Sequence, residues 1–142
     1  YRMSNISAGI GRGQLKVLDQ RVKKKRYIYD FYKKELSGLD GIGFMPNNKW
    51  DNPNYWLSVI TLTKKVRPID IINALKEENI ESRPVWKPMH LQPYFRSYDF
   101  IGDSVSEDLF KNGVCLPSDT KMKDEDLERV VKTIKRLWLD NE

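Results

Sequence analysis

The sequence has few of the residues on which disulfide and metal chemistry depend. Among its 142 residues it contains one cysteine, Cys115, and one histidine, His90. A single cysteine cannot form a disulfide within the chain, and these two residues cannot complete a zinc site built from protein ligands alone. We therefore expect no internal disulfide and no metal centre, and the cysteine usage favours a reducing compartment.

Long apolar runs and leader segments are also missing. No uninterrupted apolar stretch approaches the roughly 20 residues of a membrane-spanning helix. The chain does not open with the charged region, apolar core and cleavage site of a signal peptide. The sequence thus predicts a soluble, cytoplasmic protein that has no membrane partner.

The motifs of phosphate loops and hydrolases are absent or misplaced. The three glycines of residues 9–13 lie within a helical pattern instead of between a strand and a helix, so we expect them to permit close packing. No Gly-x-Ser-x-Gly elbow is present, and Cys115 falls in an apolar strand, as a core residue does. Nucleophilic hydrolysis is therefore not expected.

The net charge of +5 is compatible with an anionic partner. The densest basic run, RVKKKR at residues 21–26, lies between Asp19 and Asp30 on a predicted helix, where Val22 keeps the apolar register. No helix-turn-helix spacing, zinc-finger pattern or RNA-binding signature accompanies it. A solvated helix face is the favoured interpretation, and nucleic acid is not the expected partner.

The first quarter of the chain predicts one long amphipathic helix. Apolar side chains in residues 4–36 recur mostly at spacings of three, four or seven, with Ser4 as the N-cap and Gly38 placed to end the helix. At 1.5 Å per residue, such a helix is long enough to link one domain to another.

Strands and helices alternate in the remainder, which predicts a small α/β sandwich with helices packed on a short sheet. The expected extended elements are a short apolar segment at 42–45, a strand at 55–62, an extended segment at 80–83 and a strand at 114–117. One helix is expected from Pro68 to a left-handed Asn79, with Ile69, Ile72 and Leu75 buried. A second helix, opened by a capping box of Ser104 and Glu107 and closed by Gly113, should run through Lys111, and a third should span 124–139.

The segment 80–95 has the most unusual composition. Its three prolines fix φ and remove backbone donors, which predicts a stiff loop. The loop carries two cations, the only histidine and three aromatic residues, a set suited to a flat, polar or anionic small molecule. Equally, the aromatic side chains could simply cover the core.

Several motifs in order give a resemblance to a known family. The motifs are YRMSN at 1–5, GIGRGQL at 9–15, NYWL at 54–57, SRPVWKPMHLQP at 82–93 and GVCLPS at 113–118. With these motifs, the sequence resembles the C-terminal part of the DegT-type, pyridoxal-phosphate-dependent sugar-nucleotide aminotransferases, most closely those acting on UDP-4-keto-6-deoxy-N-acetylhexosamines.

The resemblance implies part of a fold-type I aminotransferase. Residues 1–37 would link two domains and residues 38–142 would form the small C-terminal α/β domain. The large domain, with the Schiff-base lysine that binds pyridoxal 5'-phosphate (PLP), would lie upstream of residue 1. No catalytic residue and no covalently bound PLP are then expected in this chain, whose lysines lie on helix faces and termini where none is predicted to be desolvated.

The resemblance also implies which residues would bind substrate. His90 falls where the family places a histidine at the substrate mouth, with Arg83 and Trp86 close by in sequence. Arg2 belongs to a motif that reaches across the dimer interface, and the asparagine of that motif would precede Tyr1. These four residues are the predicted substrate-binding residues, in an enzyme expected to act as a homodimer.

Two functions of different classes follow. The first is the C-terminal domain of a PLP-dependent aminotransferase that moves an amino group, with glutamate as the expected donor, onto a nucleotide-linked 4-keto sugar for surface-glycan synthesis. The second is a free-standing α/β module that binds an anionic ligand or nucleic acid through its basic and aromatic loop.

Overall fold

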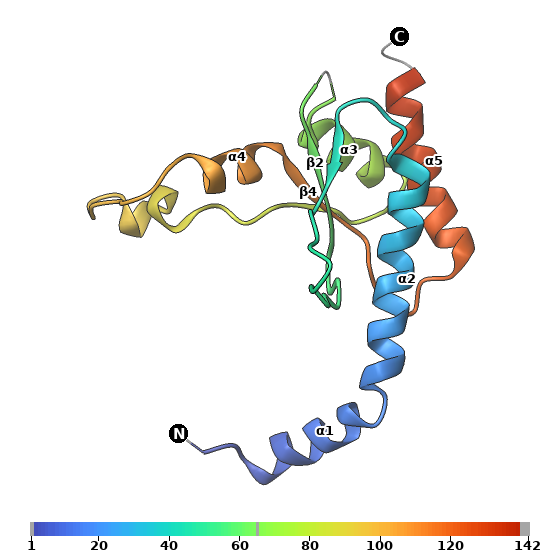
Figure 1. The fold of residues 1–142 in the computed structure, drawn as a ribbon, viewed down its shortest axis with the longest axis vertical. Coiled ribbons are helices and arrows are strands. Elements are labelled where there is room, and N and C mark those ends of the chain that lie inside the picture. The colour runs from blue at the N-terminus through green and yellow to red at the C-terminus, as the bar shows by residue number, and fades with distance from the viewer. Residues whose placement is uncertain (1, 65, 140–142) are drawn as a thin grey trace.

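An antiparallel sheet forms the centre of the fold (Figure 1). A computed structural model describes residues 2–64 and 66–139, and within them the sheet has four strands in the order β1-β2-β4-β3. The strands are β1 (Ile42–Phe44), β2 (Ser58–Leu62), β3 (Arg83–Pro84) and β4 (Gly113–Leu116). Val59 pairs with Cys115 and Arg83 also pairs with Cys115, which places these three side chains on one face.

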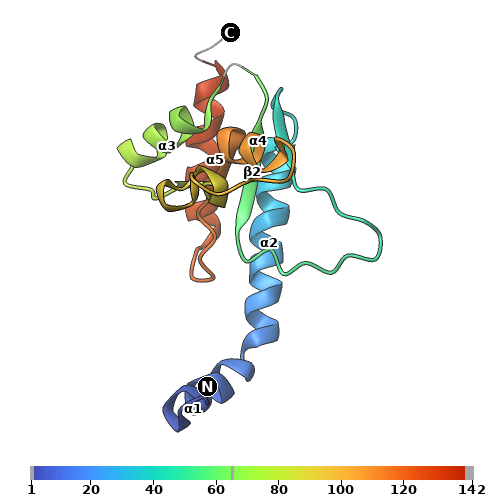
Figure 2. The same cartoon turned by 90° about the vertical axis from the view of Figure 1, so that its left-hand side faces the viewer.

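Three helices pack against the opposite face (Figures 1 and 2). They are α2 (Leu18–Leu36), α3 (Pro68–Glu77) and α5 (Asp124–Leu139). Two further helices lie outside this layer: α1 (Asn5–Leu15) projects from the start of α2, and α4 (Val105–Asn112) precedes β4. The mixed α/β prediction, with helices packed on a short sheet, is confirmed.

The period of two in the strands decides which side chains enter the core. Ile60 and Leu62 of β2 point to the helices together with Val114 and Leu116 of β4, and all four are buried. The helices contribute Ile28, Tyr32, Leu36, Ile71, Leu75, Leu127, Val130, Val131 and Ile134, and Val66 joins the cluster from the segment before α3.

A buried tyrosine ties α2 to the end of β4. The Tyr32 hydroxyl donates a hydrogen bond of 2.8 Å to the Pro117 carbonyl. Burial raises the pKa of Tyr32 well above its ordinary value, so the hydroxyl keeps the proton that this bond requires. The same helix that fills the core therefore also satisfies a carbonyl where β4 ends.

The prediction of one helix over residues 4–36 is wrong at Lys16 and Val17, where the chain breaks into α1 and α2. The apolar register already slips there, because Ile10 and Leu15 are five residues apart and no single face can hold both. No residue of α1 is buried, and the three glycines of residues 9–13 have open space where a Cβ would stand. Their predicted role in close packing is thus not seen.

Other boundaries differ where a local signal was misinterpreted. The strand expected at 55–62 begins only at Ser58, because Tyr55 takes a left-handed φ of 48°. Helix α2 ends at Leu36, and the left-handed glycine of the following turn is Gly41 rather than Gly38. Ile69, expected to be buried, is exposed, and Ile71 takes its place in the core.

Signals at helix ends that use proline or asparagine are confirmed. Pro68 opens α3, and the Arg67 backbone N–H donates 2.9 Å to the Asp70 carboxylate. Asn79 has a φ of 57° and ends the segment as predicted. Helix α5 begins and ends at the predicted residues 124 and 139.

Helix α4 passes into β4 without a connecting residue. Asn112 ends the helix and Gly113 begins the strand. A Cβ on Gly113 would stand 2.5 Å from the Leu109 carbonyl oxygen and 2.5 Å from a Val85 methyl group. Only glycine fits this junction without movement of the backbone.

Among the helices of the described residues, none is long and apolar enough to cross a membrane.

Helix α3 offers a matched test of the core assignment. Ile71 is 0% exposed and Ile69 is 47% exposed on the same helix. We expect Ile71→Ala to lower the free energy of unfolding by about 2–5 kcal/mol and Ile69→Ala to change it by no more than about 0.5 kcal/mol. Denaturant unfolding of the chain measures both, and equal losses in the two variants would contradict the assignment.

Candidate functional site

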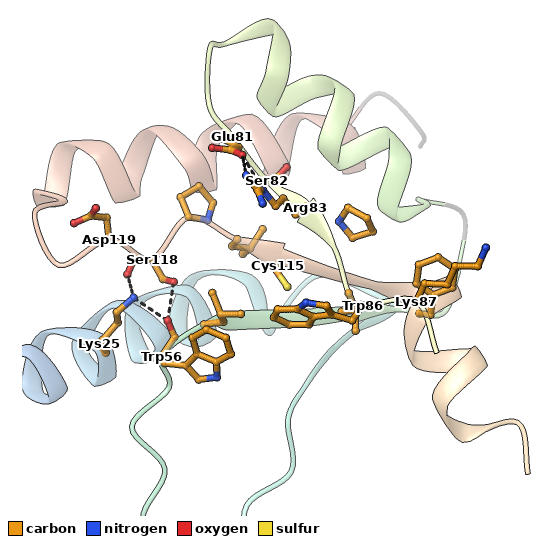
Figure 3. Close-up of a pocket in the computed structure, with 16 residues that line it drawn as sticks. Lys25, Trp56, Glu81, Ser82, Arg83, Trp86, Lys87, Cys115, Ser118 and Asp119 are labelled. Atoms are coloured by element: carbon orange, nitrogen blue, oxygen red, sulfur yellow. Dashed lines mark hydrogen bonds and ion pairs between the residues drawn. The ribbon is translucent and has the colours of Figure 1, made fainter. Parts of the chain in front are cut away.

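A cleft of about 720 Å³ opens where β3 and the end of β4 meet the start of β2 (Figure 3). Small-molecule sites commonly have volumes of roughly 300–1,000 Å³. Two of the predicted site residues, Arg83 and Trp86, line this cleft. The structure therefore brings half of the predicted set to one place.

Two exposed indole rings form one wall of the cleft. Trp56 and Trp86 stack with their ring centroids 5.8 Å apart and an angle of 26° between the planes. The rings are large and mostly exposed, at 62% for Trp56 and 64% for Trp86. Figure 3 shows them on the side of the sheet toward which the Cys115 sulfur points. Such a surface suits the face of a planar or sugar ring.

Arg83 brings a cation that is already balanced. Its Nε and Nη2 donate to one oxygen of Glu81 at 2.8 and 2.6 Å. Both side chains are exposed, so this ion pair is screened by water and worth little to stability. The guanidinium keeps further N–H groups for a phosphate or carboxylate.

Ser82 adds an unused hydroxyl next to Arg83. Its Oγ is inaccessible to solvent and has no hydrogen-bond partner among the described residues. Ser82 also lines the cleft. An unpaired buried hydroxyl is costly, and a polar group could bond to this oxygen only after a local movement that exposes it.

Lys25 differs from the expectation that no lysine is desolvated. Burial lowers the pKa of Lys25, an effect that the nearby Asp119 carboxylate opposes. Its Nζ donates to the Trp56 carbonyl at 2.8 Å and to the Ser118 carbonyl (Figure 3). The amine is thus occupied as a hydrogen-bond donor, and it fixes the backbone of Trp56 and Ser118, at one end of the cleft, to α2.

The basic run on α2 is only partly the solvated face that the sequence predicted. Arg21 donates 2.7 Å to the Thr120 hydroxyl, and Arg26 Nε donates 3.0 Å to the Pro53 carbonyl. Together with Lys25, these cations hold the loops that flank β2 and β4. Their role within the chain accounts for their position without a nucleic acid.

His90 lies in a separate cluster, on a short 3-10 turn at Met89–Leu91. Its Nε2 is 3.0 Å from the Glu107 carboxylate of α4. Its ring stacks on Phe100 at a centroid distance of 3.7 Å and an interplanar angle of 22°. The His90 side chain is only 15% exposed. The histidine is therefore held on two sides by protein groups.

Arg2 is not brought near the other three residues. It precedes α1, which projects away from the sheet in both views (Figures 1 and 2). Its side chain is exposed, and no described residue hydrogen-bonds to it. A binding role for Arg2 would require a contact outside the described part of this chain.

The described residues contain no cluster of metal-ligating side chains. No group of three or more His, Cys, Asp or Glu side chains in residues 2–64 and 66–139 could hold an ion. Cys115 is buried, and burial raises the pKa of its thiol, which makes it a poor nucleophile. Lys25, whose pKa burial lowers, donates to the Trp56 and Ser118 carbonyls, so its amine is engaged within the chain.

Sequence reasoning missed several residues of these two sites. Trp56 was visible in the motif NYWL, but its place in a presumed buried strand hid its exposure. Glu107 was assigned to a capping box. Lys25 was one of several cations in a basic run, and only its distant carbonyl partners distinguish it.

The sequence matches known aminotransferases along nearly its whole length. Residues 1–135 match the DegT/DnrJ/EryC1/StrS aminotransferase family. The chain is 48% identical over 143 residues to EpsN of Bacillus subtilis (strain 168), whose name describes a pyridoxal phosphate-dependent aminotransferase. It is 33% identical over 141 residues to the GDP-perosamine synthase of Escherichia coli O157:H7. These alignments cover 97% and 99% of this chain.

The fold agrees with the sequence match. The crystal structure of the sugar aminotransferase CalS13 from Micromonospora echinospora superimposes with a TM-score of 0.84 at 22% identity, covering 97% of this chain and 37% of that chain. At this identity the likeness concerns the fold alone. The chain likewise spans only 37% and 38% of the lengths of the two curated relatives. On the match of residues 1–135, the chain belongs to the DegT/DnrJ/EryC1/StrS aminotransferase family.

Proposed function

We propose that this chain is the C-terminal portion of a PLP-dependent sugar-nucleotide aminotransferase. The complete enzyme, a homodimer, transfers an amino group from glutamate to a nucleotide-linked 4-keto sugar used in surface polysaccharide synthesis. The upstream large domain holds the cofactor and its lysine, residues 1–37 link the domains, and residues 38–142 form the small domain.

One observation carries this proposal: nearly the whole chain matches one aminotransferase family while spanning about 37% of the length of its relatives. The names of other relatives support the substrate class, because they refer to GDP-perosamine and to dTDP-4-amino-4,6-dideoxy-D-glucose. The 142 residues of this chain are too few to hold, beside the small domain at residues 38–142, a second domain of the usual 100 residues or more.

The residues of this chain would bind and orient the substrate. The Trp56 and Trp86 rings offer flat apolar faces, and Arg83 offers a phosphate group the N–H donors that Glu81 does not bind. His90 supplies a directed ring nitrogen from the adjacent loop. PLP, when bound by the complete protein, supplies the electron sink that amino transfer needs.

The alternative function, an independent binding module for anions or nucleic acid, receives less support. That alternative was suggested by the basic and aromatic loop, and the densest basic run lies elsewhere, on α2, where Arg21, Lys25 and Arg26 donate hydrogen bonds to Thr120, Trp56 and Pro53 of the same chain. These contacts within the chain account for the positions of the three cations without a bound nucleic acid.

The complete protein should transaminate a nucleotide-linked 4-keto-6-deoxy sugar. We expect product with glutamate as donor and with one of the UDP-, GDP- or dTDP-linked sugars, measured by chromatography of the amino sugar nucleotide. A control without PLP should give none. Activity with none of the three nucleotides would refute the proposed substrate class.

Substitution of Arg2 or His90 by alanine in the complete enzyme should impair substrate use. Loss of one charge-assisted contact costs about 1.5–3 kcal/mol, which is roughly ten- to a hundredfold in kcat/KM. Arg12→Ala, which removes another exposed arginine beside α1's end, is the control and should leave kcat/KM unchanged. Unchanged kinetics in Arg2→Ala and His90→Ala would reject their assignment, and a large fall in melting temperature would assign His90 a structural role.

The 142-residue chain alone should not bind PLP covalently. After incubation with PLP and borohydride reduction, we expect no stoichiometric label on a single lysine, measured by peptide mass spectrometry. Lys25 is the critical residue, because burial lowers its pKa while its Nζ already donates to two carbonyls. Stoichiometric labelling of Lys25 would show that this chain carries an imine-forming amine of its own.

A further inference from the structure

The imidazole of His90 is held more firmly than a loop residue needs to be. Its Nε2 lies 3.0 Å from Glu107 Oε1, and the Phe100 ring covers one face at a centroid distance of 3.7 Å. Within the described residues, no hydrogen-bond partner of Nδ1 is found. One nitrogen of the ring is therefore engaged, and the other is left for a ligand.

Local contacts shape the turn that carries His90, and Glu107 comes from a helix joined to the sheet. Pro88 precedes the 3-10 turn that carries the histidine, and the Gln92 side chain closes the loop with a 3.2 Å hydrogen bond to the Lys87 carbonyl. Glu107 lies in the first turn of α4, which runs directly into β4 at Gly113. The carboxylate is thus fixed relative to the sheet.

Glu107 is free to bind the histidine because it does not cap its own helix. The Ser104 hydroxyl, expected to form a capping box with Glu107, instead donates 3.0 Å to the Asp108 carboxylate. The backbone N–H of Val105 is 3.3 Å from the Asp103 carboxylate. Neighbouring acids thus serve the helix terminus, and the Glu107 carboxylate points to His90.

We propose that Glu107 and Phe100 are positioning residues that fix the tautomer and the direction of the His90 ring. An ionised carboxylate only accepts hydrogen bonds, so Nε2 must carry the proton and Nδ1 must be the free nitrogen. The neutral ring then presents a lone pair to a hydroxyl or amine, and the protonated ring presents an N–H to a phosphate or carboxylate. The catalytic consequence rests on the proposed function, whereas the tautomer does not.

The test uses the only histidine of the chain, which gives a single imidazole spin system in nitrogen-15 NMR. At alkaline pH, the nitrogen shifts of the wild-type chain should report almost purely the Nε2–H tautomer. Glu107→Ala should produce a mixture of tautomers, and Glu107→Gln should retain the Nε2–H form because its amide oxygen still accepts. Phe100→Leu should remove the ring-current shift of the His90 protons.

Asp108→Ala is the matched control. It removes a carboxylate from the same turn of α4 and changes the net charge equally, but Asp108 bonds to Ser104 and not to His90. We expect a wild-type tautomer ratio in this variant. A tautomer mixture in the wild type, or the same ratio in Glu107→Ala and the wild type, would overturn the proposal. If Glu107→Ala does not fold, the tautomer ratios of the wild type and Glu107→Gln test the proposal: the Nε2–H form in both supports it, and a mixture in the wild type overturns it.

Kinetics of the complete enzyme test the consequence for substrate. Glu107→Ala should lower kcat/KM by about ten- to a hundredfold, with Glu107→Gln recovering most of the loss and Asp108→Ala unaffected. Full activity of Glu107→Ala would overturn the positioning role in the reaction. If the wild type shows no transamination, the proposed function has failed, and the NMR ratios alone decide whether Glu107 sets the ring.

Discussion

Burial of one face of a small antiparallel sheet is the constraint on which the rest of this structure depends. Ile60, Leu62, Val114 and Leu116 point to α2, α3 and α5, and alternation along the strands sends Val59 and Cys115 to the other face. The cleft can open only on that second face, where Trp56 and Trp86 lie. The register of β2 on β4 therefore determines both which side chains pack in the core and on which face the candidate site lies.

Elements with strong local signals could be predicted from the sequence. The apolar stripe and acidic start of α5 give its two ends, and Pro68 and Asn79 mark α3 and the turn after it. The prediction of one helix over residues 4–36 was wrong because the five-residue spacing between Ile10 and Leu15 was not interpreted as a helix break. The prediction that Ile69 is buried was wrong because the sequence of a short helix does not determine which of several adjacent apolar residues will face the sheet.

The candidate site could be predicted only in the part that a single loop contains. The composition of residues 80–95 marked this segment, and the family resemblance gave Arg83, Trp86 and His90 within it; the structure differs from the predicted loop in that Arg83 lies in the edge strand β3 and His90 on a 3-10 turn. Their partners come from elsewhere: Trp56 from the connection before β2, Lys25 from α2 and Glu107 from α4. Each partner has an equally good local role as a strand residue, a solvated cation or a helix cap, so only the tertiary fold distinguishes them.

The direct passage from α4 to β4 has a consequence for how this chain can vary in length. An inserted residue between Asn112 and Gly113 would turn α4 by about 100° about its axis and carry Glu107 away from His90, while shifting nothing in the core. The connection between β1 and β2 can change in length at less cost in residues 46–51, because the hydrogen bonds from α2 to Asn52 and Pro53 lie beyond these residues. Insertions among homologous chains should therefore collect within residues 46–51 and be excluded at residue 113, where one added residue would separate Glu107 from His90, its partner 17 residues earlier in the sequence.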